Sequence, residues 1–169
     1  VLSYFKLKNF MILFSKIITL AKIVIKIKIY ISRPSQTKIL VYDRVSKRFA
    51  DAFFPNKSFS FYDVRYESIN LYVFFFTLMN CGIKNFKINY KFNYFNFIKP
   101  TIVYTSIDNN IGFFKLKKLY PDAFYIADQN GIRDNVFYSQ CKKFLKKFPN
   151  YNLSTDIFFC FGNNEKKKN

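Results

Sequence analysis

Five short apolar runs follow one another along most of the chain, and polar residues come after each of them. The runs are rich in β-branched and aromatic residues, as strands are, and they occupy residues 38–42, 58–62, 101–107, 123–127 and 156–161. Segments of helical length separate them. Short apolar strands that alternate with helices are typical of a parallel sheet. We therefore predict an α/β fold, a Rossmann-like open parallel sheet with helices on both faces.

Three of the separating segments predict helices, at residues 67–80, 84–98 and 110–120. The first is strongly apolar and closes on Gly82, a residue type that commonly ends helices. The third has three lysines in its last turns and Pro121 just beyond, which suits the end of a helix. The second fits both a helical and an alternating pattern. We favour a helix there because Pro100 ends the pattern just before a strand.

The amino-terminal residues 1–33 carry six Lys and one Arg without any acid. Lysines interrupt their apolar run too often for a transmembrane span. Residues 22–31 alternate with period two, which fits a strand. If the segment is instead a helix, four lysines share one side of it: Lys8, Lys16, Lys22 and Lys26. Such a helix either lies on an anionic membrane surface or packs on the protein with its lysines in solvent.

The formal net charge is +18, from 28 Lys and Arg against 10 Asp and Glu. Such a charge suits a nucleic acid, an anionic membrane or an anionic substrate, and an AT-rich coding sequence explains it equally well. The chain has no histidine, which excludes the usual catalytic triads and mixed Cys/His zinc sites. Its three cysteines lack C-x-x-C spacing and fit buried thiols in a reducing compartment. Neither a dinucleotide fingerprint nor a P-loop occurs, so we predict no cofactor. We assign no metal ligands, and the acids at several strand ends are equally suited to Mg²⁺ and to solvent.

The polar residues that follow the strands are the candidate binding residues. In a parallel sheet all carboxyl ends meet at one edge, and ligands bind there. Asp, Asn and Gln suit sugar hydroxyls, and Arg65 or Arg133 suits a phosphate. Helix capping, a turn at Asn130-Gly131 and a loop ion pair between Asp63 and Arg65 are the structural alternatives. The residues at the strand ends are Asp43, Arg44, Asp63, Arg65, Glu67, Asp108, Asn109, Asn110, Asp128, Gln129, Asn130, Asn163 and Asn164.

An ordered series of motifs lies within residues 36–164: DVRYESINL at 63–71, KPTIV at 99–103, IDNN at 107–110 and QNGIR at 129–133. This series resembles the surface carbohydrate biosynthesis family of bacteria. That family is similar to glycosyltransferases with two Rossmann-type domains (GT-B), and more distantly to CDP-glycerol glycerophosphotransferases. The resemblance implies a glycosyltransferase-like domain for polysaccharide assembly, which takes a carbohydrate acceptor.

The resemblance also implies an organisation and a set of site residues. We expect a basic amphipathic segment and linker at 1–35, the Rossmann-like acceptor-side domain at 36–164 and a basic tail at 165–169. Asp108 is the catalytic candidate, since Asn130 stands where the glycerophosphotransferase-like relatives have a candidate histidine base. The expected substrate-binding residues are Asp63, Arg65, Glu67, Asn109, Asn110, Gln129, Asn130, Gly131 and Arg133.

Members of this family continue into a second domain that binds a sugar nucleotide, whereas this chain stops soon after the fifth strand. We therefore expect a truncated or split protein whose isolated chain has little activity, with the donor domain separate or encoded downstream. The resemblance implies a cytoplasmic protein, held on the inner face of the cell membrane through residues 1–33 if that segment binds anionic lipid.

A basic RNA-binding or ribosome-associated protein is the alternative hypothesis. Lysines are interleaved with aromatic residues at 84–99 and 142–148, and such surfaces suit single-stranded nucleic acid. The polar clusters at the strand ends have no role in this hypothesis.

Overall fold

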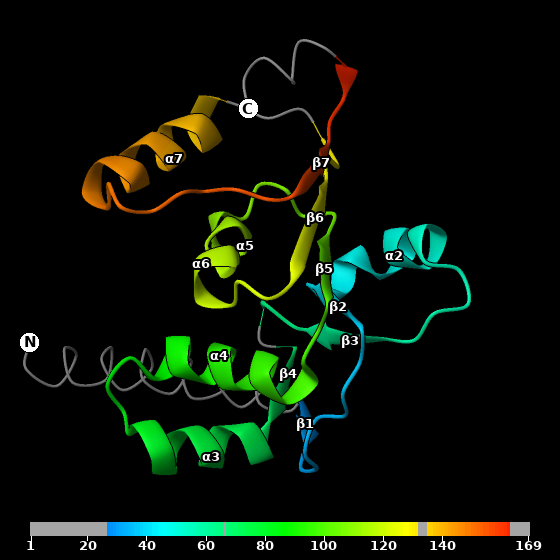
Figure 1. Ribbon diagram of the computed structural model, residues 1–169, viewed down its shortest axis with the longest axis vertical. Coiled ribbons are helices and arrows are strands. Elements are labelled where there is room, and N and C mark those ends of the chain that lie inside the picture. Colours follow the sequence, from blue (N-terminus) through cyan, green and yellow to red (C-terminus); the bar gives the residue numbers. More distant parts are fainter. Residues whose placement is uncertain (1–26, 66, 132–134, 163–169) are drawn as a thin grey trace, which may run out of the picture.

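A computed structural model describes residues 27–65, 67–131 and 135–162. Its main sheet has five parallel strands in the order β3-β2-β5-β6-β7 (Figure 1). This confirms the predicted α/β fold, and each strand lies within or beside a predicted run. The bounds are Ile39–Tyr42 for β2, Phe59–Tyr62 for β3, Ile102–Thr105 for β5, Phe124–Asp128 for β6 and Ile157–Phe159 for β7.

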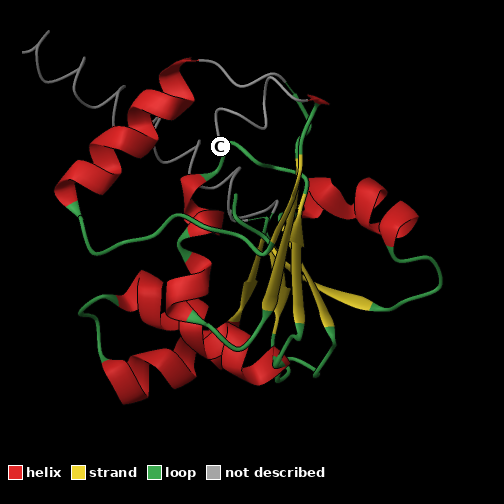
Figure 2. Cartoon of the chain, turned by 45° about the horizontal axis from the view of Figure 1, so that its top comes forward, coloured by secondary structure: helices red, strands yellow, loops and turns green. Residues whose placement is uncertain are grey.

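Helices cover both faces of the sheet, but unequally (Figure 2). A short 3₁₀ turn, Arg44–Ser46, leads into α2 (Lys47–Phe53), which lies on one face. Buried Ala50 of α2 packs there with Ile39, Val41 and Tyr104. The other face is covered by α4 (Phe86–Ile98), α5 (Ile111–Phe114), α6 (Leu116–Leu119) and α7 (Asn135–Lys147).

The core on the second face consists largely of aromatic side chains. Strand residues alternate between the two faces, so that Leu40 and Tyr42 of β2 face these helices together with Val103 and Tyr125. The ring of Tyr42 contacts that of Phe113, with centroids 5.6 Å apart. Burying each such side chain contributes roughly 1.5–3 kcal/mol. The aromatic richness of the sequence therefore serves this core.

One predicted helix begins later than its sequence pattern indicated. Residues 68–70 form strand β4 (Ser68–Asn70), which pairs in parallel with β1 (Lys28–Tyr30) in a separate two-stranded sheet. Helix α3 (Leu71–Cys81) follows, because the Oδ1 atom of Asn70 accepts the N–H of Val73 and so caps the helix. The predicted start at residue 67 was therefore wrong, while the helix itself is present.

The remaining differences concern short or polar segments. The predicted helix at 110–120 is split into α5 and α6 at Lys115, and α2 and α7 were not predicted. The strand-like alternation of residues 22–31 is realised at β1. Residues 1–26 of the predicted amino-terminal segment and the tail at 165–169 lie outside the described residues. In the described part of the chain no helix has the length and apolar character needed to cross a membrane.

Candidate functional site

The chain reverses its direction across the sheet between β2 and β5. From β2 the chain passes over α2 to β3 on one side, and it then returns over the opposite face to β5 on the other side. Such a reversal is the point of an open α/β sheet at which ligands usually bind. A hollow of about 450 Å³ opens there, lined by Asp43, Val64, Arg65, Ile107, Asn109, Asn110, Ile111, Gly112 and Gln140.

Asp43 and Arg65 form an ion pair at the wall of this hollow. The backbone of Asp43 has a φ of +80°, and its Oδ1 atom accepts the N–H of Val45 at 3.1 Å. Its Oδ2 atom lies 3.3 Å from Nε of Arg65. The carboxylate is buried, whereas the Arg65 side chain is 58% exposed, so the guanidinium remains accessible from the hollow.

A second ion pair, between Arg44 and Asp63, lies beside the hollow and serves the fold. Arg44 donates from Nε and Nη2 to the two carboxylate oxygens of Asp63, at 3.1 and 3.0 Å, and Ser68 Oγ donates to the same carboxylate. The Arg44 guanidinium also stacks 4.5 Å from the ring centroid of Phe61. Asp63 therefore pairs with Arg44, and Arg65 pairs with Asp43. The ion pair between Asp63 and Arg65 that the sequence suggested does not form.

Glu67 lies next to this second ion pair. Burial raises the pKa of the Glu67 carboxyl, and the negative charges of Asp63 and Asp43 raise it further. Its Oε2 atom is buried and accepts no hydrogen bond from any residue that the structure describes. Glu67 does not line the hollow, and its raised pKa makes it a group that binds a proton more readily than an ordinary glutamate.

A third group of polar residues lies at the ends of β5 and β6. Burial raises the pKa of Asp128, and the neighbouring charge of Asp108 adds to the effect. Asp108 is only 1% exposed, and its Oδ1 atom lies 3.5 Å from the backbone N of Asn130. The lining of the hollow does not include Asp108, so the catalytic candidate is a buried carboxylate beside the hollow.

Two of the predicted binding amides are used in the protein's own hydrogen bonds. Gln129 is buried, accepts the N–H of Phe161 at 2.9 Å and donates to the carbonyl of Gly131 at 2.8 Å, so it links β6 to the segment after β7. Asn110 caps α5 by accepting the N–H of Gly112 at 2.8 Å. A Cβ atom on Gly112 would lie 2.8 Å from Oδ1 of Asn110, so this position requires glycine to keep the cap.

Lys91 of α4 lies beneath this edge of the sheet and was not predicted as a notable residue. Its Nζ donates to the Tyr42 hydroxyl at 3.2 Å and lies 5.4 Å and 5.5 Å from the ring centroids of Tyr42 and Tyr62. Burial lowers the pKa of Lys91 to about 8, and the charges of Lys87 and Lys115 contribute to the decrease. A partly buried lysine in an aromatic helix has no local sequence signature, which explains why it was missed.

The structure thus brings together only some of the predicted site residues. Arg65, Asn109 and Asn110 line the hollow, while Asp63 and Glu67 lie in the neighbouring cluster. Asp108, Gln129, Asn130 and Gly131 are at the ends of β5 and β6, and Arg133 lies outside the described residues. Gln140 lines the hollow without having been predicted, and Asp43 lines it although, of the strand-end candidates, it was not among the expected substrate-binding residues. The end of the first strand pointed to Asp43, whereas Gln140 lies on the unpredicted helix α7.

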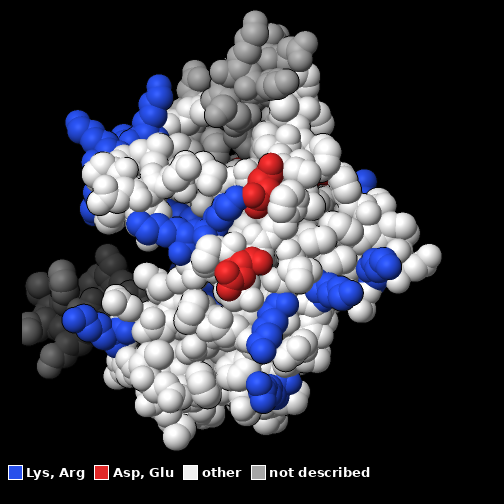
Figure 3. All heavy atoms as spheres, in the orientation of Figure 1, with Lys and Arg blue, Asp and Glu red and all other residues white. Residues whose placement is uncertain are grey.

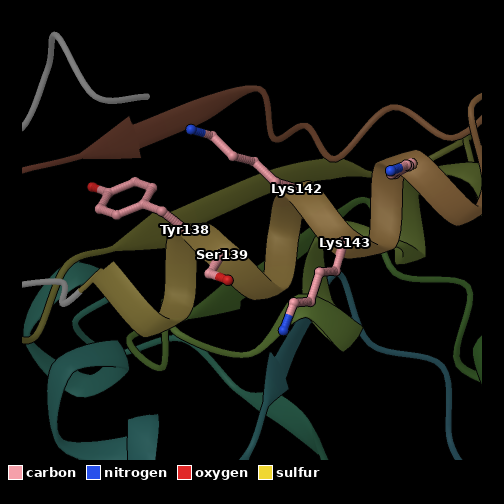
Figure 4. A pocket seen from close by; sticks show the side chains of 5 residues that line it. Tyr138, Ser139, Lys142 and Lys143 are labelled. Carbon is pink, nitrogen blue, oxygen red and sulfur yellow. The ribbon is translucent and has the colours of Figure 1, made fainter.

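A second hollow, of about 410 Å³, lies against α7 and has a basic lining (Figure 4). Its residues all belong to this helix: Tyr138, Ser139, Lys142, Lys143 and Lys146. Since one helix supplies the whole lining, it is a surface groove. In the described ranges no three or more Cys, Asp or Glu side chains are arranged to hold a metal ion.

Comparisons of this chain with protein-family models, with curated proteins and with solved structures found no match.

Proposed function

We propose that the hollow at the carboxyl ends of β2 and β5 binds a hydroxyl-rich acceptor, and that the chain is the acceptor-side domain of a glycosyltransferase-like protein of surface carbohydrate biosynthesis. The observation that carries this proposal is the lining of the hollow, in which Arg65, Asn109 and Gln140 come from three separate segments. The motif series at 63–133 supports the choice of carbohydrate.

The lining offers the three kinds of contact that a sugar requires. The amides of Asn109 and Gln140 each present a donor and an acceptor, which suits neighbouring hydroxyls. Val64, Ile107 and Ile111 offer apolar surface to the C–H groups of a sugar ring. The Nε side of the Arg65 guanidinium faces Asp43, so an anionic group on the acceptor would meet its outer nitrogen atoms.

Asp108, the catalytic candidate, does not contact the acceptor in this proposal. Its burial and its place outside the lining argue against direct contact with an acceptor hydroxyl, which we assign to Asn109 and Gln140. Transfer would also need a sugar-nucleotide donor, for which the lining of this hollow provides no separate site. We therefore test acceptor binding instead of turnover.

The test is acceptor binding, measured by saturation-transfer NMR and calorimetry with neutral oligosaccharides and with glycerol-phosphate-bearing ones. Asn109→Ala should weaken both kinds of ligand by about 10-fold, because one good hydrogen bond is worth about 1.4 kcal/mol. Arg65→Ala should weaken only the anionic ligands. Asn96→Ala, at an exposed position of α4, is the matched control. Equal binding by all three variants would show that the hollow is not the site.

Nucleic-acid binding remains the second candidate, because the groove on α7 carries three lysines. The aromatic rings nearby already have partners: Lys115 lies 3.7 Å from the ring centroid of Phe144, and Lys118 lies 4.1 Å from that of Tyr151. Bases would have to displace these lysines to stack. Affinity for single-stranded RNA that falls steeply with salt, and that Lys142→Glu lowers, would favour this candidate.

A further inference from the structure

Helix α3 has an unusual distribution of polar and apolar side chains. It contains no charged residue, and only Val73 and Thr77 of its residues are buried. Thr77 Oγ1 accepts a hydrogen bond at 3.0 Å from Asn93 of α4, so a polar contact lies on the inner side of the helix. A helix that faces water normally has the opposite arrangement, with its apolar stripe inward.

The outward side of α3 and the turn after it are apolar. Met79 is 84% exposed and Ile83 is 82% exposed, and Phe75 lies one turn before Met79 with 54% of its surface exposed. The spacing of four residues places Phe75 and Met79 on the same side of α3, and Ile83 follows in the turn after the helix. Ile88 of α4, five residues after Ile83, is also exposed. Contiguous exposed apolar surface of this kind marks an interaction site.

The exposed charges near Phe75, Met79 and Ile83 are positive, which bears on the kind of partner that this surface suits. Residues 68–107 contain no Asp or Glu. Lys84 in the turn after α3 and Lys87 in the first turn of α4 are exposed. Figure 3 shows the surface over α3 without charged side chains and with basic side chains at its borders. Large apolar side chains flanked by lysines are typical of a segment that lies in the headgroup region of an anionic bilayer.

We propose that the α3–α4 hairpin is a membrane-docking surface, which inserts Phe75, Met79 and Ile83 into an anionic lipid surface while Lys84 and Lys87 contact the headgroups. This surface is distinct from residues 1–33, and the proposal does not depend on the acceptor site. The hairpin lies at the opposite end of the molecule from α7 (Figure 1). Docking would therefore leave the edge that carries the hollow away from the bilayer plane.

The absence of tryptophan from the chain permits a direct test with the whole chain. Met79→Trp places one fluorophore at the proposed contact, and Val136→Trp, at an exposed position at the start of α7, is the matched control. With vesicles of phosphatidylglycerol and phosphatidylcholine, we expect the emission of Trp at 79 to move to shorter wavelength and to be quenched by brominated lipid. The emission of Trp at 136 should not change.

Flotation with the same vesicles measures the strength of binding. Met79→Asp combined with Ile83→Asp should lower the partition coefficient at least about 10-fold, since both side chains would lose their apolar contact with lipid. Val136→Asp should have no such effect. All these positions are exposed, and circular dichroism of each variant checks that it is folded. Lys84→Glu should weaken binding to anionic vesicles, and high salt should do the same.

Several results would overturn the proposal. Vesicle binding with unchanged emission at position 79 would mean that another segment, such as residues 1–26, makes the contact. No binding to anionic vesicles would exclude a lipid partner. A shift of emission without vesicles, accompanied by concentration-dependent sedimentation, would show that a second copy of the chain covers α3.

Discussion

Replacement of Lys91 by Met tests the electrostatics of the core beneath the hollow. Lys91 is held between the rings of Tyr42 and Tyr62 and donates to the Tyr42 hydroxyl. Its pKa is about 8 instead of the ordinary 10.5, chiefly because burial disfavours the ammonium ion. Methionine has a similar length and shape without the charge, so the variant removes the cost of burying the cation and keeps most of the packing.

The two pKa values set the magnitude. Each pKa unit corresponds to about 1.4 kcal/mol, so the buried ammonium ion costs about 3 kcal/mol of stability at pH 7, where folded and unfolded chains are both protonated. The lost hydrogen bond and cation–π contacts offset about 1 kcal/mol of this. Lys91→Met should therefore raise the free energy of unfolding by about 2 kcal/mol at pH 7.

The sign of the pH dependence follows from the lowered pKa. Between pH 8 and 10.5 the folded chain releases the proton of Lys91 before the unfolded chain does, so the stability of the native protein rises with pH in this window. Below about pH 8 the folded chain keeps the Lys91 ammonium ion, so the full cost of burying this cation is present. The advantage of Lys91→Met should accordingly shrink by about 2 kcal/mol between pH 7 and pH 9.5.

Urea unfolding of both proteins at pH 7, 8.5 and 9.5 measures this difference. Burial raises the pKa of Tyr94 and Tyr125, whose ordinary value is 10.0, so measurements below pH 10 keep their titration small. Lys84→Met, at an exposed position, is the control and should not alter the pH dependence. A difference between the native protein and Lys91→Met that does not change with pH would refute the reasoning.

Three further substitutions test the contacts that position the site. Asn70→Ala removes the cap of α3 and should cost about 1 kcal/mol in urea unfolding, whereas Asn70→Asp should retain most of it. Asp63→Asn breaks the paired contact with the partly exposed Arg44 and should cost roughly 2 kcal/mol; a cost near zero would mean that water replaces the pair. Glu67→Gln should stabilise the protein at pH 7 and much less at pH 4. The pKa of Glu67 is raised in the folded state, so the native protein loses stability as the pH rises above the ordinary pKa of a glutamate and the buried carboxyl ionises. A destabilising effect at pH 7 would show that the ionised carboxylate is needed.

The strands were predictable because each buried strand is a short, local apolar run. The α7 helix was not, since most of its apolar positions are interrupted by exposed lysines. The late start of α3 was missed because Ser68–Asn70 becomes a strand only through its pairing with β1, some 40 residues earlier in the chain. That pairing is a long-range contact, which a local pattern does not contain.

The sequence by itself determined the α/β class and the edge at which polar residues collect. Short, near-continuous apolar runs that alternate with segments of helical length specify a parallel sheet, and parallel strands necessarily bring their carboxyl ends to one edge. Only the tertiary structure decided which of these polar residues are available to a ligand. Asp63 and Gln129 are engaged in the protein's own contacts, while Arg65 and Asn109 face the hollow. Hydrogen bonds and ion pairs depend on distances of about 3 Å between segments far apart in the chain, and folding alone sets those distances.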